Sequence, residues 1–108
     1  MTLPGTDIAK VFHALGDPNR RLMVETLSNG PMSVSRLAEP FDMTLTAVAQ
    51  HLAILEAAGL VTTEKLGRTR TAQIGRAGFA AIELWLKDRR TPLERRLDAL
   101  GDLLDEDQ

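Results

Sequence analysis

The chain has 108 residues, 44% of them hydrophobic and 26% charged, which is the size and composition of a single globular domain. It contains no cysteine, which excludes disulfides, thiolate metal sites and thiol redox chemistry. No apolar run approaches the roughly 18 residues of a membrane span and no signal peptide pattern leads the chain, so we expect a cytoplasmic protein. The net charge is −2, but residues 98–108 hold five of the fifteen acids and no base, so residues 1–97 carry +3.

The first predicted helix follows a lead-in, residues 1–5, which we expect to be disordered. Its apolar residues recur at the i, i+3, i+4, i+7 spacing of one helical face: Ile8, Val11, Phe12 and Leu15. Gly16 ends this helix, and Asp17-Pro18 begins a second one, because Asp is a favourable N-cap and Pro fits the first helical position. The second helix is predicted to run to about Ser28. It is expected to bury Leu22, Met23 and Leu27.

Two short helices joined by a tight turn are predicted next. Ser33 caps the third helix, which must end near Pro40. The inward residues of this helix are expected to be Val34, Leu37, Ala38 and Phe41. The connection is Asp42-Met43, with Asp42 suited to left-handed geometry. Thr44 then caps a fourth helix over 45–58, closed by Gly59, whose inward residues are Val48, Leu52 and Leu55.

The periodicity then changes from helix to strand. Residues 60–65 and 70–74 are β-prone runs joined by a glycine-containing turn of hairpin length. A fifth helix begins near Arg76 to Phe79 and is broken by Pro92 near Thr91; its apolar residues are Phe79, Ile82, Trp85 and Leu86. Beyond the break, the steps 4, 3, 4 of a short coiled-coil seam join Leu93, Leu97, Leu100 and Leu104. The predicted fold is mainly α with a small β-hairpin wing, in the order ααααββα(α).

Two short helices followed at once by a basic hairpin predict a winged helix-turn-helix that binds double-stranded DNA. The side chains expected to face outward from the fourth helix, and thus the major groove, are Thr46, Ala47, Gln50 and His51. Gln50 has the geometry to pair with adenine. Phosphates are expected to bind near the helix N-termini at Ser33, Ser35 and Thr44, and on the wing at Lys65, Arg68 and Arg70.

Each assignment has a structural alternative. Gln50 is otherwise a solvated helix residue, and His51 otherwise packs against the third helix. Ser33 serves first as a helix cap, and the basic hairpin is otherwise an ordinary solvated surface. Ala47 and Ala49 keep the front of the fourth helix small enough for close approach to DNA under the functional interpretation.

The same residues carry a resemblance to a known family. The stretches 12–20 (FHALGDPNR), 33–38 (SVSRLA), 48–61 (VAQHLAILEAAGLV) and 67–69 (GRT) resemble the ArsR/SmtB family of winged helix-turn-helix repressors. The resemblance covers about residues 6–86. It implies a domain over residues 6–91 and a dimer built from the first helix and the segment 79–104, continued by a C-terminal dimerisation helix with an acidic tail over 92–108. The interface candidates are Ile8, Phe12, Ile82, Trp85, Leu93, Leu97 and Leu100.

Two departures from the family pattern matter. Ala49 stands where the family usually has Ser, so one polar contact to DNA is missing. The metal ligands of the founding members are also missing, because there is no cysteine and residues 76–104 contain no His. His13 and His51 lie on different predicted helices without ligand partners. The chain therefore resembles the metal-free branch of the family, and we expect no metal and no cofactor.

The expected function is that of a transcriptional repressor that binds a pseudo-palindromic operator as a homodimer. A small-molecule inducer that releases it is compatible with this function but is not identified by any residue. The alternative is a winged helix used for protein–protein assembly, without operator binding. Catalysis is not expected, because no nucleophile–base set, carboxylate pair, phosphate loop or dinucleotide fingerprint can be assembled.

Overall fold

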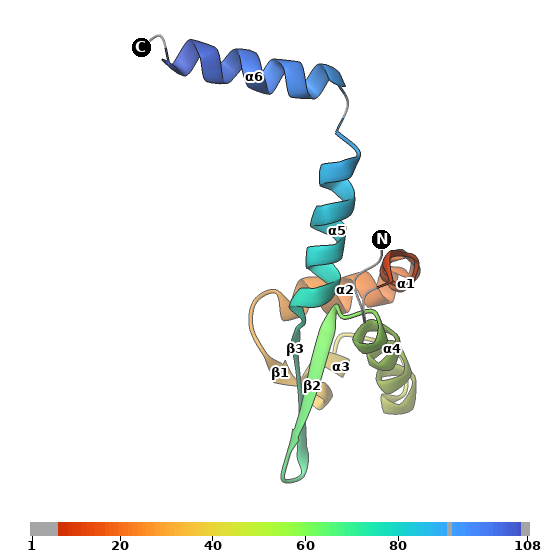
Figure 1. Cartoon of the computed structure of the whole chain (residues 1–108). Helices are drawn as coiled ribbons and strands as arrows, with labels where there is room; N and C mark the ends of the chain where they lie inside the picture. Colours follow the sequence, from red (N-terminus) through yellow and green to blue (C-terminus); the bar gives the residue numbers. More distant parts are fainter. Residues whose placement is uncertain (1–6, 91, 107–108) are drawn as a thin grey trace.

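The computed structural model describes residues 7–90 and 92–106 (Figure 1). In chain order its elements are α1 (Ile8–Leu15), α2 (Pro18–Leu27), β1 (Met32–Ser33), α3 (Val34–Ala38), α4 (Leu45–Ala57), β2 (Val61–Leu66), β3 (Thr69–Ile74), α5 (Arg76–Asp88) and α6 (Pro92–Glu106). The predicted lead-in, residues 1–5, lies outside the described residues, as does the side chain of Leu93. All six predicted helices and both hairpin strands are confirmed.

One strand escaped the sequence analysis. Met32 and Ser33 form β1, which pairs antiparallel with Ala72 and Thr71 and gives a sheet of order β1-β3-β2. Two residues are too few to show the alternation that marks a strand, and their partners lie some forty positions away in the chain. The element order is therefore ααβααββαα rather than ααααββαα.

Side-chain caps define where four helices begin. The side chains of Asp7, Asp17, Ser33 and Thr44 accept the backbone N–H of Ala9, Arg20, Arg36 and Ala47 at 2.9, 2.9, 3.2 and 3.1 Å. The hydrogen bond from the Arg20 N–H lowers the pKa of the Asp17 carboxyl below its ordinary value of 3.8. The expected left-handed conformation at Asp42 is wrong, since glycines alone have positive φ in the described part of the chain.

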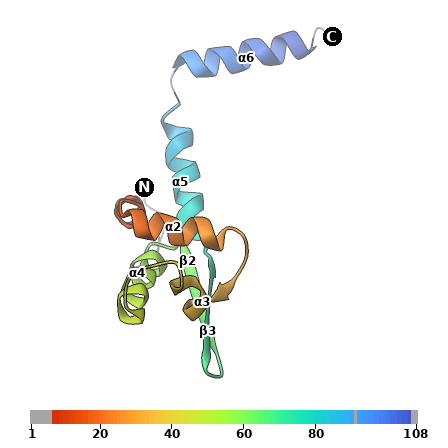
Figure 2. The same ribbon diagram turned by 180° about the vertical axis from the view of Figure 1, so that it is seen from behind.

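The core lies where α1, α2, α3 and α4 meet the inner face of the sheet (Figures 1 and 2). Its fully buried large side chains are Met23, Leu27, Leu37, Leu55, Leu60, Val11, Val48 and Val61. Leu22 was expected among them, but its side chain is 44% exposed. The buried stripe of α2 instead runs through Arg20, Met23, Val24 and Leu27 at helical spacing, and Leu22 falls off that stripe.

Three glycines join the end of α4 to the start of α5. Gly59 has φ +75° and closes α4, and its carbonyl accepts the N–H of Gly78 at 2.8 Å. A Cβ on Gly78 would lie 2.8 Å from the carbonyl oxygen of Ala58, and a Cβ on Gly75 would lie 2.7 Å from that of Gly59. The backbones therefore cross too closely for side chains, and α5 starts without a side-chain cap.

Candidate nucleic-acid interface

One face of α4 is exposed, polar and small. Val48, Leu52 and Leu55 are buried, which turns the opposite side of the helix to solvent. We call that side the reading face and define it by Thr46, Ala49, Gln50 and Ala53, all of which are exposed. The expected outward orientation of Thr46 and Gln50 is confirmed. Ala47 and His51 were expected on the same face, but both are half-buried on its flank.

His51 is half-buried because it contacts a buried arginine on α2. Its Nδ1 lies 3.3 Å from Nη1 of Arg20, whose side chain is 8% exposed. The same guanidinium donates from Nε to the Ala14 carbonyl at 2.7 Å and from Nη2 to the His13 carbonyl at 3.2 Å. Arg20 thus binds the last carbonyls of α1 and the flank of α4 together. The sequence analysis expected His51 either on the outward face or against α3; the side chain is half-buried, and its hydrogen-bond partner lies on α2.

Arg20 was missed by the sequence analysis, although a signal was present. It occupies the first position of the stripe that continues with Met23, Val24 and Leu27. An arginine on an otherwise apolar stripe is buried only when hydrogen bonds satisfy its charge. In this chain the carbonyls at the end of α1 supply those bonds.

The wing is the hairpin of β2 and β3. Leu66 pairs with Thr69, which leaves a two-residue turn, Gly67-Arg68, with positive φ at Gly67 alone, the pattern of a type II′ turn. Lys65 pairs with Arg70, and the alternation of side chains puts both on the same face of the hairpin as buried Val61 and Ala72. The two cations therefore continue the inner face of the sheet, on the side of α4. Lys65, Arg68 and Arg70 are all exposed.

A hydrogen-bonded chain joins the wing to α4. The Glu56 carboxylate accepts from the Thr63 backbone N–H at 3.1 Å and from the Thr63 hydroxyl at 3.0 Å. The hydroxyl of Thr63 in turn accepts from Nη1 of Arg70 at 3.1 Å. Arg70 is thus held against β2, whereas Arg68 occupies the turn itself. Neither Glu56 nor Thr63 was singled out from the sequence, because their pairing depends on the angle between a helix and a strand.

Ser33 and Thr44 cap α3 and α4, as the sequence analysis predicted. Ser33 and Thr44 use their oxygens as cap acceptors, which leaves each hydroxyl its own O–H to donate. Ser35 is exposed on α3, and α3 packs against α4 and the sheet. Within residues 7–90 and 92–106, no three His, Asp or Glu side chains gather so as to hold a metal ion. Over the same residues, no helix is long and apolar enough to cross a bilayer.

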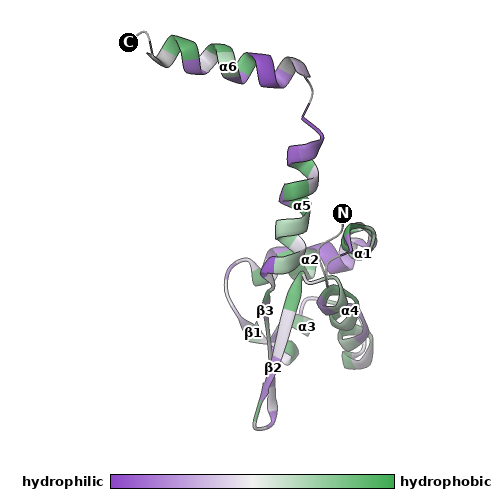
Figure 3. Cartoon of the chain, viewed as in Figure 1, coloured by the Kyte–Doolittle hydropathy of each residue, from purple (hydrophilic) through white to green (hydrophobic). Residues whose placement is uncertain are grey.

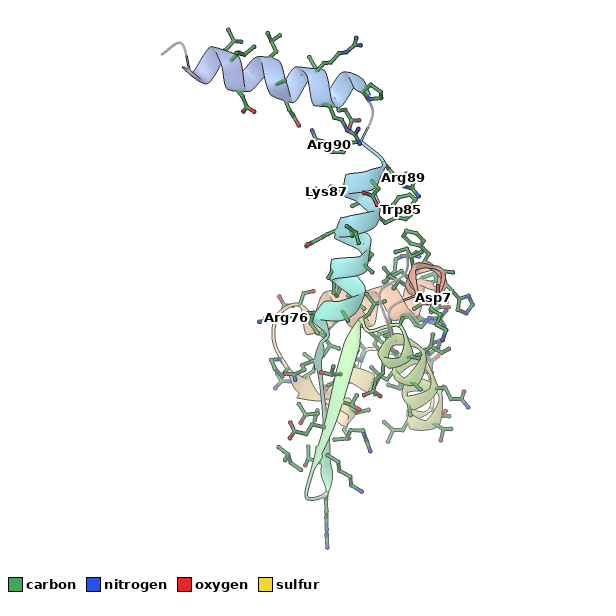
Figure 4. All side chains as sticks on the ribbon, in the orientation of Figure 1. Asp7, Arg76, Trp85, Lys87, Arg89 and Arg90 are labelled. Carbon is green, nitrogen blue, oxygen red and sulfur yellow. The ribbon has the colours of Figure 1, made fainter. Side chains whose placement is uncertain are left out.

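The described residues among the predicted interface candidates divide into three groups. Ile8 and Ile82 pack against the core of their own chain. Phe12 and Trp85 form an edge-to-face pair with ring centroids 5.1 Å apart, and the Arg89 guanidinium lies 5.0 Å from the Trp85 centroid (Figure 4). Phe12 is 42% exposed. Leu97 and Leu100 lie on α6 and are exposed.

Comparison with known proteins agrees with this geometry. A family model described as a helix-turn-helix domain matches residues 15–64. The HTH-type transcriptional regulator Rv2034 of Mycobacterium tuberculosis is 37% identical over 86 residues, which cover 80% of this chain and 74% of that protein. The crystal structure of an ArsR family transcriptional regulator, RHA00566, is 44% identical with a TM-score of 0.72, over 75% of this chain and 89% of that one. The chain belongs to the ArsR/SmtB family.

As a member of the ArsR/SmtB family, the protein is a DNA-binding transcriptional regulator with a winged helix-turn-helix fold. A further family structure is the homodimeric winged helix-turn-helix domain Mb0332 of Mycobacterium bovis, described as a possible ArsR-family regulator. It is 25% identical with a TM-score of 0.61, over 78% of this chain and 82% of that one.

Proposed function

We propose that this ArsR/SmtB-family protein is a homodimeric repressor that places α4 of each protomer in the major groove of a pseudo-palindromic operator. The observation that carries the proposal is the arrangement of the reading face beside the wing. A polar, small-residue helix face and the cations Lys65 and Arg70 are presented on the same side of the hairpin. This combination suits base edges at the helix and phosphates at the wing.

On the reading face, Gln50 is the proposed base reader. Its amide can pair with N6 and N7 of adenine, and Thr46 can bind a phosphate or contact a thymine methyl group. Ala49 and Ala53 add no bulk and let the helix approach the base edges. Ala47 and His51 border this face on the flank held by Arg20, where we propose that they seat the helix on the DNA.

The phosphate contacts are proposed at exposed donors around this face. They are the wing cations Lys65, Arg68 and Arg70 and the hydroxyls of Ser33, Ser35 and Thr44. Contacts of this kind fix orientation and affinity and carry no sequence information. Their signature is a dependence on salt concentration, because each neutralised phosphate releases condensed counterions.

A second protomer would double the base contacts and set the two copies of α4 one DNA turn, about 34 Å, apart. The homodimeric Mb0332 domain supports this assembly. We propose that Phe12 and Trp85 lie at its centre, with Ile8, Ile82, Leu93, Leu97 and Leu100 around them. Repression would follow from occupancy of a promoter. An inducer would release the dimer only as far as it binds the released state better.

The test is selection of bound duplexes from a random-sequence pool, followed by affinity measurements on the selected site. We expect about a thousandfold loss of affinity between 50 and 200 mM salt for about six phosphate contacts. Arg68→Ala should weaken binding on every sequence and reduce the slope of log affinity against log salt by about one. Binding without enrichment of any sequence, or no binding, would favour a protein-assembly role instead.

Gln50→Ala should cost about 1–3 kcal/mol at one base pair of the selected site and relax the preference there. Gln73→Ala is the matched control, because Gln73 is exposed on the opposite face of the wing from Lys65 and Arg70. The control should bind as the unaltered protein does. An equal loss from Gln50→Ala on all sequences would remove the base-reading role from Gln50.

A further inference from the structure

Arg20 and His51 form a polar link between α2 and the flank of α4. α4 is hydrophobic over most of its length, whereas the start of α2 beside it is hydrophilic (Figure 3). The Arg20 side chain is 8% exposed, and its Nη1 lies 3.3 Å from Nδ1 of His51. His51 directly follows Gln50, the proposed base reader, on the same helix. A displacement of His51 therefore moves the reading face with it.

The contact requires one protonation state of His51. A guanidinium donates hydrogen bonds and has no acceptor, so Nδ1 of His51 must accept and cannot carry a proton. The neutral ring therefore carries its proton on Nε2. When the ring takes up a second proton, that proton goes to Nδ1, the atom that faces Nη1 of Arg20. The hydrogen bond is then lost, and two positive charges lie next to each other.

Arg20 is held too firmly to move away from a protonated His51. Its Nε donates to the Ala14 carbonyl at 2.7 Å and its Nη2 to the His13 carbonyl at 3.2 Å. A guanidinium does not lose its charge in a protein, and a buried charge without hydrogen bonds is costly. The repulsion is therefore relieved by displacement of His51, and hence of the adjoining part of α4, rather than by displacement of Arg20.

One further charged group acts on His51, the carboxylate of Asp17 at the N-cap of α2. The pKa of Asp17 is lowered first by the hydrogen bond from the Arg20 N–H, and then by the positive charges of Arg20 and His51. In the described structure, every other charged or titratable side chain on α1, α2, α3 and β2, the elements that pack against α4, is exposed. A neutral His51 is thus bound by Arg20, whereas a protonated His51 is repelled by Arg20 and attracted by Asp17.

We propose that Arg20 is a positioning residue for DNA binding, which holds α4 in place through neutral His51, and that protonation of His51 releases α4 and lowers the affinity for the operator. This inference rests on the proposed function, in which α4 reads the operator. The expected sign is opposite to that of simple charge attraction, because one more positive charge beside DNA would strengthen binding to phosphates. A loss of affinity in acid therefore indicates loss of the Arg20–His51 contact.

The test compares affinity for the duplex selected from the random-sequence pool at about pH 7.5 and about pH 5.5, at constant salt. The chain has two histidines and no cysteine, so His13 and His51 are the side chains that ordinarily change charge in this range. We expect about a tenfold loss at the lower pH, the effect of one hydrogen bond to a charged group. An unrelated duplex of the same length should show no loss. His13→Asn is the matched control, because the His13 side chain is exposed on α1, and it should respond to pH as the unaltered chain does.

Two variants of His51 separate its role as an acceptor from its charge. Asn places an amide oxygen close to the position of Nδ1 and does not titrate, whereas Leu has no acceptor. Neither His51→Asn nor His51→Leu should lose affinity for the selected duplex in acid. At about pH 7.5, His51→Asn should bind more tightly than His51→Leu, because it can still accept from Arg20. Equal affinities for the two variants would mean that Arg20 does not act through His51.

Unchanged or increased affinity of the unaltered chain at the lower pH would overturn the inference, and the proposed function would stand. If no sequence is enriched at about pH 7.5, the proposed function fails, and nitrogen NMR of the free protein still tests the contact. The His51 ring, assigned by comparison with His51→Asn, should carry its proton on Nε2 near neutral pH. A proton on Nδ1 would overturn the inference without any measurement on DNA.

Discussion

Two regions of this molecule, α4 with the wing and the C-terminal helix α6, differ in whether their side chains find partners within the chain. Around α4 and the wing, polar groups are tied within one chain, through Arg20 to His51 and through Glu56 to Thr63 and Arg70. Along α6, by contrast, leucines are exposed and the last turn contains no basic residue to offset the helix dipole. A surface complete within one chain has a fixed shape to present to a rigid ligand such as duplex DNA. A surface that leaves leucines exposed in one chain, as α6 does, is instead suited to contact with another molecule.

Among the variants that test this contrast, the largest change in the free energy of unfolding is expected at Arg20. Arg20→Leu removes the buried guanidinium and leaves the carbonyls of His13 and Ala14 without its hydrogen bonds, so it should lower the free energy of unfolding by about 3 kcal/mol. The measurement is urea denaturation at one fixed protein concentration, because dimerisation also contributes.

The neighbouring Arg21 offers the matched control. It too donates to an α1 carbonyl, that of Leu15 at 2.7 Å, but its side chain is exposed. Arg21→Leu should cost less than about 1 kcal/mol, since solvent can replace an exposed bond. Equal losses for the two variants would mean that burial of the Arg20 guanidinium adds nothing.

A smaller effect is expected where backbones cross at Gly78. Gly78→Ala would place a methyl group 2.8 Å from the Ala58 carbonyl oxygen and should cost about 2 kcal/mol of stability. Gly101→Ala makes the same chemical change in α6, where no atom lies within 4 Å of the added Cβ. There we expect a gain in helicity by circular dichroism, worth up to about 1 kcal/mol. A stability loss from Gly101→Ala that matched that of Gly78→Ala would contradict the contrast between the two ends.

The smallest expected effect is a pH dependence at the cap of α2. Because the folded state lowers the pKa of Asp17 below 3.8, its carboxylate stabilises the fold above that pH and stops doing so as the pH falls through the lowered pKa. Asn also caps helices, so Asp17→Asn removes chiefly the charge. The unaltered chain should be the more stable near neutral pH, with a difference that shrinks below pH 3.8. A difference that persists unchanged in acid would mean that the charge is not its cause.

The sequence predicted those parts of the structure that repeat over several turns or are marked by caps. The helices were found because apolar residues recur and because Asp17, Ser33 and Thr44 are N-cap residues. The strand β1 was not found, because two residues have no period. His51 was placed outward, because 100° steps around a helix leave a flanking residue ambiguous until a neighbour such as Arg20 is known.

The candidate site divides in the same way. Thr46, Gln50 and the wing cations could be predicted from patterns within a few residues. The chain from Glu56 through Thr63 to Arg70 could not, because it depends on how the end of α4 meets β2. Local sequence thus indicates which polar groups are exposed on α4 and the wing, and tertiary structure decides which of them are fixed by hydrogen bonds.

The glycine crossing between α4 and α5 has a mechanical consequence. With no side chains between the two backbones, and with the Gly78 N–H bound to the Gly59 carbonyl, there is little there to compress or shear. In the proposed dimer, a tilt of α5 against α5 of the second copy would therefore be transmitted to α4 with little loss. An effector of such a dimer would not need to contact α4. A change of a few degrees between the two copies of α5 would alter the distance between the two copies of α4.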